Sequence, residues 1–155
     1  MQAMTIVLRP AHADEAPVLS ALCLRSKAHW GYDAAFMRAC VAELTLRPED
    51  LTPDTLVVAE IDGALAGMAQ VGPVGADADL MAMFIDPDYI GQNLGRVLFN
   101  WCVETARAMG APRLMIDADP QAAGFYTRMG AVQIGTTPSG SIPGRVLPLL
   151  EYPLR

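Results

Sequence analysis

One stretch of the chain, residues 80–110, combines a strand pattern, a turn with two glycines and a long helix pattern. Residues 80–85 form an apolar run, and the polar turn Gly91-Gln92-Asn93-Leu94-Gly95 follows it. Apolar side chains then recur close to an i, i+3, i+4, i+7 spacing over residues 94–109, which predicts an amphipathic helix ended by Gly110. A strand–turn–helix unit of this kind leaves backbone N–H groups unpaired at the positive end of the helix dipole. It therefore suits an anion such as a pyrophosphate.

The two glycines of this turn have two explanations, which the sequence leaves open. One is structural, a left-handed conformation or tight packing, and the other is the close approach of a ligand. The spacing in residues 91–95 contains no G-x-G, so it is not the dinucleotide fingerprint. No Gly-Lys-Ser/Thr follows, which excludes a Walker A loop.

The remaining periodicities predict a single domain of alternating strands and helices over residues 4–155, with Met4 as an alternative start to Met1. Asp62-Gly63 between two apolar runs is a strong hairpin signal. Asp119-Pro120 predicts that a helix begins at Pro120. The expected order is β-α-α-β-β-β-α-β-α-β-β, an α+β fold with a mostly antiparallel central sheet flanked by helices. The expected strands cover residues 5–10, 56–61, 64–71, 80–85, 113–117, 132–135 and 146–152.

The charge and cysteine content of the chain argue against several classes of partner. Acidic residues outnumber basic ones, 17 against 11, and no basic run is present, so we expect no nucleic-acid partner. Cys23, Cys40 and Cys102 lie on apolar faces of predicted helices and form no C-x-x-C pair, which indicates reduced core residues and no metal site. Without a signal peptide or a long apolar span, we expect a cytoplasmic protein with no membrane partner.

Residues 90–95 resemble the central motif of the GNAT superfamily of N-acetyltransferases, commonly Q/R-x-x-G-x-G/A after a strand and opening a helix. Ile90 replaces the usual Gln or Arg, and Asn93 replaces the first Gly, while Gly95 is retained. Asn adopts the left-handed region more readily than other non-glycine residues, so the turn is expected to keep its shape. Residues 117–131, with Phe125-Tyr126 before Gly130, are similar to the next segment of the same family.

The resemblance implies the GNAT fold and acetyl-CoA as cosubstrate. In that fold the fourth and fifth strands separate, and the pantetheine arm lies between them. The implied cofactor-binding residues are Met83, Phe84, Ile85, Gln92, Asn93, Leu94, Gly95, Arg96, Asp119 and Tyr126. Most of these would contribute backbone groups. Arg96 could contact a phosphate or could be a solvated helix residue. Asp119 stands where the family often has Asn, and capping the following helix is its favoured role.

Tyr126 is the expected catalytic residue, because it corresponds to the family tyrosine that can protonate the leaving thiolate. Phe125 is expected to be the core anchor of the pair. The general base stays open among Asp79, Glu60 and Asp117.

The loop between the first two helices forms a wall of the acceptor site in the resembled fold, which implicates His29, Trp30 and Tyr32 in substrate binding. The alternative is a loop held by aromatic packing, favoured for Trp30. Residues 141–145 could close the same site from the opposite side, with Arg145 holding a substrate carboxylate.

The sequence therefore predicts an acetyl-CoA-dependent N-acetyltransferase that acts on the primary amine of a small molecule or amino acid by direct transfer in a ternary complex. One alternative is a non-catalytic coenzyme A-binding sensor or interaction module. Another is an acetyltransferase that modifies a peptide, which would need an open groove. The resemblance also leaves open a homodimer formed through the last strands.

Overall fold

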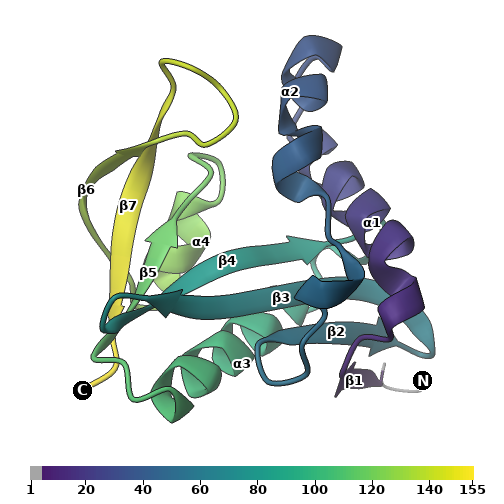
Figure 1. The fold of residues 1–155 in the computed structure, drawn as a ribbon, viewed down its shortest axis with the longest axis horizontal. Helices are drawn as coiled ribbons and strands as arrows, with labels where there is room; N and C mark the ends of the chain where they lie inside the picture. Colours follow the sequence, from purple (N-terminus) through teal and green to yellow (C-terminus); the bar gives the residue numbers. More distant parts are fainter. Residues whose placement is uncertain (1–4) are drawn as a thin grey trace.

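The computed structural model describes residues 5–155, so Met4 lies outside the described residues (Figure 1). The predicted order of elements is confirmed, with three short 3-10 turns added at Ala13–Glu15, Pro48–Asp50 and Pro87–Tyr89. The strands are β1 (Ile6–Arg9), β2 (Leu56–Ile61), β3 (Ala64–Val74), β4 (Asp77–Ile85), β5 (Arg113–Asp117), β6 (Val132–Pro138) and β7 (Val146–Pro153). The helices are α1 (Ala16–Ala28), α2 (Ala34–Leu44), α3 (Leu94–Ala108) and α4 (Ala123–Arg128).

The strands form one mixed sheet in the order β1-β2-β3-β4-β5-β7-β6. Every neighbouring pair is antiparallel except β4 and β5, which run parallel. This pair joins only through Ala78 with Leu114 and Asp79 with Met115, and beyond these residues the two strands separate. The mostly antiparallel sheet and the separation of its fourth and fifth strands are as predicted.

Two local features shape the strands before this separation. Asp62 and Gly63 have φ angles of 50° and 85°, which form the predicted tight turn between β2 and β3. Further along, Val71 pairs with Leu80 and Gln70 pairs with Ala82, so Met81 is an extra residue in β4. Such a β-bulge bends the strand that carries it. It changes which side chains of β4 face each side of the sheet.

Helices cover both faces of the sheet (Figure 1), and apolar side chains are buried on each face. On one face, α3 places Leu94, Leu98, Phe99, Cys102, Val103 and Ala106 in the core. On the other face, α1 buries Leu19, Leu22 and Cys23 against β2 and β3. Burying a leucine-sized side chain contributes about 2 kcal/mol, so these contacts hold the helices to the sheet.

The three cysteines are free and buried, as predicted. Burial raises the pKa of both Cys23 and Cys102 to about 12, so neither thiol ionises near neutral pH. Within residues 5–155, no group of three His, Cys, Asp or Glu side chains is arranged to hold a metal ion. None of the helices in this range is long and apolar enough to span a bilayer.

The start of α4 differs from the prediction. The helix begins at Ala123 rather than at Pro120, because Asp119 closes a separate turn before it. The Asp119 backbone carbonyl accepts hydrogen bonds from the N–H groups of Ala122 and Ala123 at 2.8 and 3.1 Å. Its side-chain Oδ1 accepts from the N–H of Gln121 at 2.9 Å. Pro120 therefore lies in a turn, and Asp119 caps that turn rather than the helix.

Candidate active site

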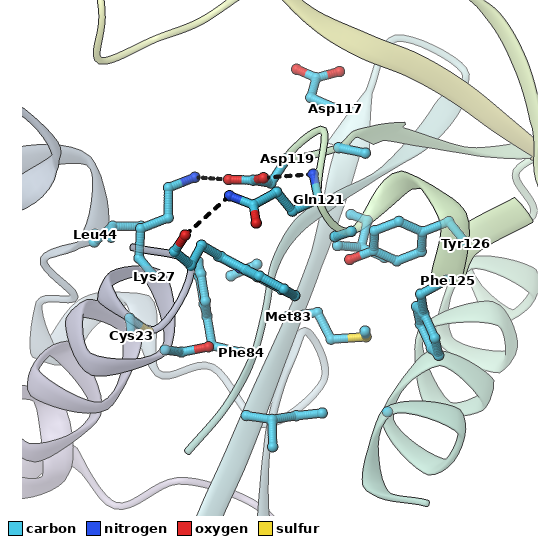
Figure 2. A pocket seen from close by; sticks show the side chains of 18 of the residues that line it. Cys23, Lys27, Leu44, Met83, Phe84, Asp117, Asp119, Gln121, Phe125 and Tyr126 are labelled. Carbon is cyan, nitrogen blue, oxygen red and sulfur yellow. Dashed lines mark hydrogen bonds and ion pairs between the residues drawn. The ribbon is translucent and has the colours of Figure 1, made fainter. Parts of the chain in front are cut away.

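A cavity of about 990 Å³ lies where β4 and β5 separate. Residues 79–85 of β4 line it, and the ends of α1, α3 and α4 line its sides. Met83, Phe84 and Ile85 are among these residues, so the structure places the predicted strand segment on the cavity wall. Figure 2 shows Met83 between the side chains of α1 and those of α4.

The turn before α3 keeps the shape expected of it. Gly91 has a φ of 85°, and Asn93 has φ and ψ of 68° and 8°, both in the left-handed region. Asn is the non-glycine residue best suited to that region, so the substitution of Asn93 for glycine is accommodated. The side chain of Ile90 is 50% exposed and carries no hydrogen-bonding group. Helix α3 begins at Leu94, directly after this turn. Its first-turn N–H groups have no partner within the helix and can bind other acceptors.

The close packing of α3 against α4 explains why a glycine is present at position 95. A Cβ atom at this position would lie 3.3 Å from the ring of Phe125 and 3.5 Å from Ile85 Cδ1. Of the two explanations for the glycines, tight packing therefore applies to Gly95 and a left-handed conformation to Gly91. The missing side chain lets α4 approach the start of α3, which brings the two predicted motifs together.

The other residues of the motif take different positions. Asn93, Leu94, Gly95 and Arg96 line the cavity, whereas Gln92 does not. The buried Oε1 of Gln92 has no hydrogen-bond partner among the described residues. Arg96 is exposed and forms no ion pair with any of residues 5–155, so its guanidinium is available at the cavity wall.

Tyr126 is buried, with 6% of its surface exposed, and packs against Phe99 and Phe125. It is the more deeply buried member of the Phe-Tyr pair, so the prediction that Phe125 is the core anchor was wrong. The reason is that Phe125 faces Gly95 and the cavity wall. The Tyr126 hydroxyl points into the cavity (Figure 2) and forms no hydrogen bond with the described residues.

The electrostatic environment keeps this phenol protonated. Burial is the main cause that raises the pKa of Tyr126, and nearby Cys102 and Asp119 add to it. A phenol with a raised pKa remains a proton donor at neutral pH. The geometry and the protonation state thus agree with a group that donates a proton into the cavity.

Asp119 connects three other segments at the cavity. Its Oδ2 accepts hydrogen bonds from Lys27 Nζ and from the Tyr32 hydroxyl, both at 2.7 Å, and Arg145 Nη2 lies 3.6 Å away. Burial alone would raise the pKa of Asp119, but the hydrogen bonds from Lys27, the Gln121 N–H and Tyr32 outweigh it and hold the pKa below its usual range. Asp119 is therefore ionised, and we call Lys27, Tyr32, Asp119 and Arg145 the Asp119 cluster.

The predicted acceptor residues fall into two groups. Tyr32 stacks on Phe36 with ring centroids 3.9 Å apart, and Arg145 Nη2 donates to the Tyr32 hydroxyl at 2.8 Å. His29 and Trp30 line the cavity and pack edge to face with centroids 6.0 Å apart. The structure thus brings Tyr32 and Arg145 into direct contact and leaves His29 and Trp30 as a neighbouring aromatic pair.

The three candidate bases occupy different environments. Glu60 is ion-paired with Arg9 at 3.3 Å and does not line the cavity. Asp79 and Asp117 both line it, and neither has an ion-pair partner among residues 5–155. Burial, followed by the charge of Asp117, raises the pKa of Asp79. Partial burial at the cavity wall also raises the pKa of Asp117, the more exposed of the two.

Lys27 and Glu43 are not among the predicted site residues. Helix α1 continues to Ala28 and directs Lys27 to Asp119. Glu43, on α2, lines the cavity and accepts a hydrogen bond from the hydroxyl of Ser141. Since both contacts join residues about a hundred positions apart, no local pattern in the sequence indicates them.

Comparisons with known proteins identify the family to which these motifs belong. Residues 24–131 match the model of the Acetyltransferase (GNAT) family. A Bacillus subtilis (strain 168) protein named as a ribosomal protein bS18-alanine N-acetyltransferase is 36% identical over 77 residues, which span about half of each protein, 48% of this chain and 51% of the relative.

Two solved structures share the fold over nearly their whole length. A GCN5-related N-acetyltransferase from Rhodopseudomonas palustris has a TM-score of 0.76 and 25% identity, with 97% of this chain and 96% of that chain covered. The PaiA N-acetyltransferase from Thermoplasma acidophilum, solved with coenzyme A, has a TM-score of 0.73 and 15% identity, with 96% and 99% covered. Because the family match extends over more than half of its residues, the chain belongs to the GNAT family of acetyltransferases.

Proposed function

We propose that the protein is an N-acetyltransferase that uses acetyl-CoA to acetylate the primary amine of a small molecule or amino acid by direct transfer in a ternary complex. The observation that carries this proposal is the position of the Tyr126 hydroxyl, which has no hydrogen-bond partner among residues 5–155 and points into the cavity where β4 and β5 separate. Family membership supports acetyl transfer, and the relative solved with coenzyme A supports the cosubstrate.

The residues present fit coenzyme A. The left-handed Asn93 and the close approach allowed by Gly95 place the first-turn N–H groups of α3 at the cavity, where they suit a pyrophosphate. Arg96 adds a guanidinium without an ion-pair partner among the described residues. The backbone of Met83, Phe84 and Ile85 would hold the pantetheine arm, because in the described part of the chain no strand pairs with β4 on the β5 side at these residues.

Acetyl-CoA supplies the acetyl group as a thioester, so the amine nitrogen forms a bond to the carbonyl carbon while the carbon–sulfur bond breaks. Tyr126 donates its proton to the departing sulfur: its hydroxyl points into the cavity, and its raised pKa keeps the phenol protonated at neutral pH. Asp79 is our candidate acceptor for the proton that the amine loses. It lies on β4 in the cavity without an ion-pair partner among residues 5–155, and its raised pKa makes it a better base than an ordinary Asp.

The alternative functions are less well supported. A non-catalytic coenzyme A sensor would need neither an unpartnered Tyr126 hydroxyl nor a cavity that extends to Asp79 and Asp117. An acetyltransferase of peptides is suggested by the name of the Bacillus subtilis relative, but it would need an open groove. Here the loop between β6 and β7 contacts α2 and Tyr32 across the cavity. These contacts favour a small acceptor.

A titration followed by an activity assay tests the proposal. We expect acetyl-CoA to bind with a micromolar Kd, about −8 kcal/mol, and a panel of small amines and amino acids to release coenzyme A thiol. Binding without thiol release for any amine would support the sensor instead. Failure to bind acetyl-CoA would overturn the proposal.

A further inference from the structure

The two carboxylate oxygens of Asp119 have different partners and therefore different structural roles. Oδ1 accepts a hydrogen bond from the N–H of Gln121 and so holds the turn before α4. Oδ2 accepts from Lys27 and Tyr32 and faces Arg145. The Oδ1 contact stabilises only the local turn. The Oδ2 contacts join this turn to α1, to the loop between α1 and α2, and to the loop between β6 and β7.

The Asp119 cluster crosses the cavity. Lys27, Asp119 and Arg145 all line it, and they come from separate segments around it. Figure 2 shows the ammonium group of Lys27 and the carboxylate of Asp119 facing each other from the α1 side and the α4 side. The side chains of Lys27, Asp119 and Arg145 are 15%, 10% and 19% exposed, so the contacts are largely shielded from solvent. Shielded ion pairs are screened less by salt than exposed ones.

Only an ionised carboxylate can hold this arrangement. Lys27 and Arg145 both carry positive charge and would repel each other without the single negative charge between them. Both cations also lie near the stacked rings of Tyr32 and Phe36, with Lys27 Nζ at 5.4 Å from the Tyr32 centroid and Arg145 Cζ at 4.9 Å from that of Phe36. The Asn that the resembled family often has at this position could cap the turn, but it carries no negative charge to place between the two cations.

We propose that Asp119 is a specificity-determining residue that holds the acceptor side of the cavity closed around small amines. This inference rests on the proposed function. Two further contacts support the same closure. Gln121 Nε2 donates to the backbone carbonyl of Trp30 at 3.3 Å, and Ser141 donates to Glu43. The first is a contact between neutral groups, whereas the second ends on a carboxylate oxygen. Asp119 differs from both because it lies between two cations, Lys27 and Arg145, and its charge is the one that we expect to hold the loops together.

The substitution Asp119→Asn separates the capping of the turn from the ionic contacts with Lys27 and Arg145. The Asn side-chain oxygen keeps the hydrogen bond to the Gln121 N–H, whereas the amide carries no charge to hold Lys27 and Arg145 together. Asp77→Asn is the matched control. Asp77 is ion-paired with Arg113 at 3.1 Å outside the cavity lining, and Arg113 keeps Glu151 as a second partner at 2.7 Å.

The experiment compares kcat/KM for two acceptors with the purified protein of residues 1–155: the most active small amine of the panel and a short peptide with a free amino terminus. For Asp119→Asn we expect KM for the small amine to rise and the peptide-to-amine ratio of kcat/KM to increase, each about tenfold. The Kd for acetyl-CoA should stay within about twofold of the wild-type value, since the turn before α4 is retained. Asp77→Asn should leave all three quantities unchanged.

The outcomes separate this inference from the function on which it rests. A wild-type protein that acetylates no amine contradicts the proposed function. An active wild type whose acceptor ratio is the same in Asp119→Asn overturns the role of Asp119. If thermal melting shows that Asp119→Asn is unfolded, Arg145→Gln and Lys27→Gln, which remove the cations one at a time, should give the same change in ratio. An unchanged ratio in both of these variants would also overturn the inference.

Discussion

The ring of Phe125 occupies the space that a side chain at Gly95 would need, because a Cβ there would lie 3.3 Å from two of its ring carbons. This relationship joins the start of α3 to α4 and so brings the turn that we propose to bind phosphate next to Tyr126. The glycine that ends the family motif therefore has a packing role, whether or not the turn binds a ligand.

Gly95→Ala tests that packing. We expect it to lower the free energy of unfolding by about 1–3 kcal/mol, the usual cost of an extra methyl group in a filled space. Gly124→Ala is the control, because a Cβ there meets only the flexible end of Arg128, at 3.3 Å. Urea denaturation should show no loss of stability for Gly124→Ala. Equal stabilities for the two variants would show that Phe125 moves aside freely.

Asn93 provides a second test, because its φ is 68°. Asn93→Val should lose about 1–2 kcal/mol of stability, since a β-branched residue is strained in the left-handed region. It should also weaken the binding of acetyl-CoA in a calorimetric titration. Asn93→Gly adopts the same angles without strain, so its affinity should match that of the wild type. If Val and Gly bind acetyl-CoA equally well, the turn does not form the phosphate site.

Much of the fold was predictable from local patterns, and much of the site was not. Asp62-Gly63, the apolar spacing of α3 and the left-handed Asn93 are set by residues close together in the chain. The start of α4 was misplaced because Asp119-Pro120 closes a turn instead of opening a helix. The pairing of Lys27 with Asp119 depends on how α1 packs against the sheet, so only the tertiary structure reveals it.

Asp79→Asn should change the pH dependence of stability. Burial and the charge of Asp117 raise the pKa of Asp79 in the folded protein above the ordinary Asp value, about 3.9 in an unfolded chain. As pH rises through these two values, the unfolded state loses its proton more readily, so ionisation of Asp79 destabilises the folded state. Asp79→Asn cannot ionise and avoids this loss.

The measurement is chemical denaturation from pH 4 to pH 7.5. Asp79→Asn should gain stability over the wild type as pH rises, and the difference should shrink toward pH 4. In the activity assay the same variant should be slower, if Asp79 accepts the proton of the amine. A variant that is less stable than the wild type at pH 7.5 would mean that the Asp79 carboxylate has a stabilising partner.

Tyr126→Phe removes the proposed proton donor while keeping the ring that packs against Phe99. We expect kcat to fall about 10²-fold, the lower end of the effect of general acid catalysis. The melting temperature and the Kd for acetyl-CoA should change little, because the hydroxyl forms no hydrogen bond with the described residues that could be lost. An unchanged kcat would assign the proton transfer to another group or to water.

Thiol release from acetyl-CoA, followed across a panel of small amines with purified wild-type protein, is the most direct test of the proposed acetyl transfer. We expect thiol release that depends on the amine, with a mass increase of one acetyl group on the acceptor. Acetyl-CoA that binds to the protein but releases no thiol above background with any amine, amino acid or peptide would contradict the proposal.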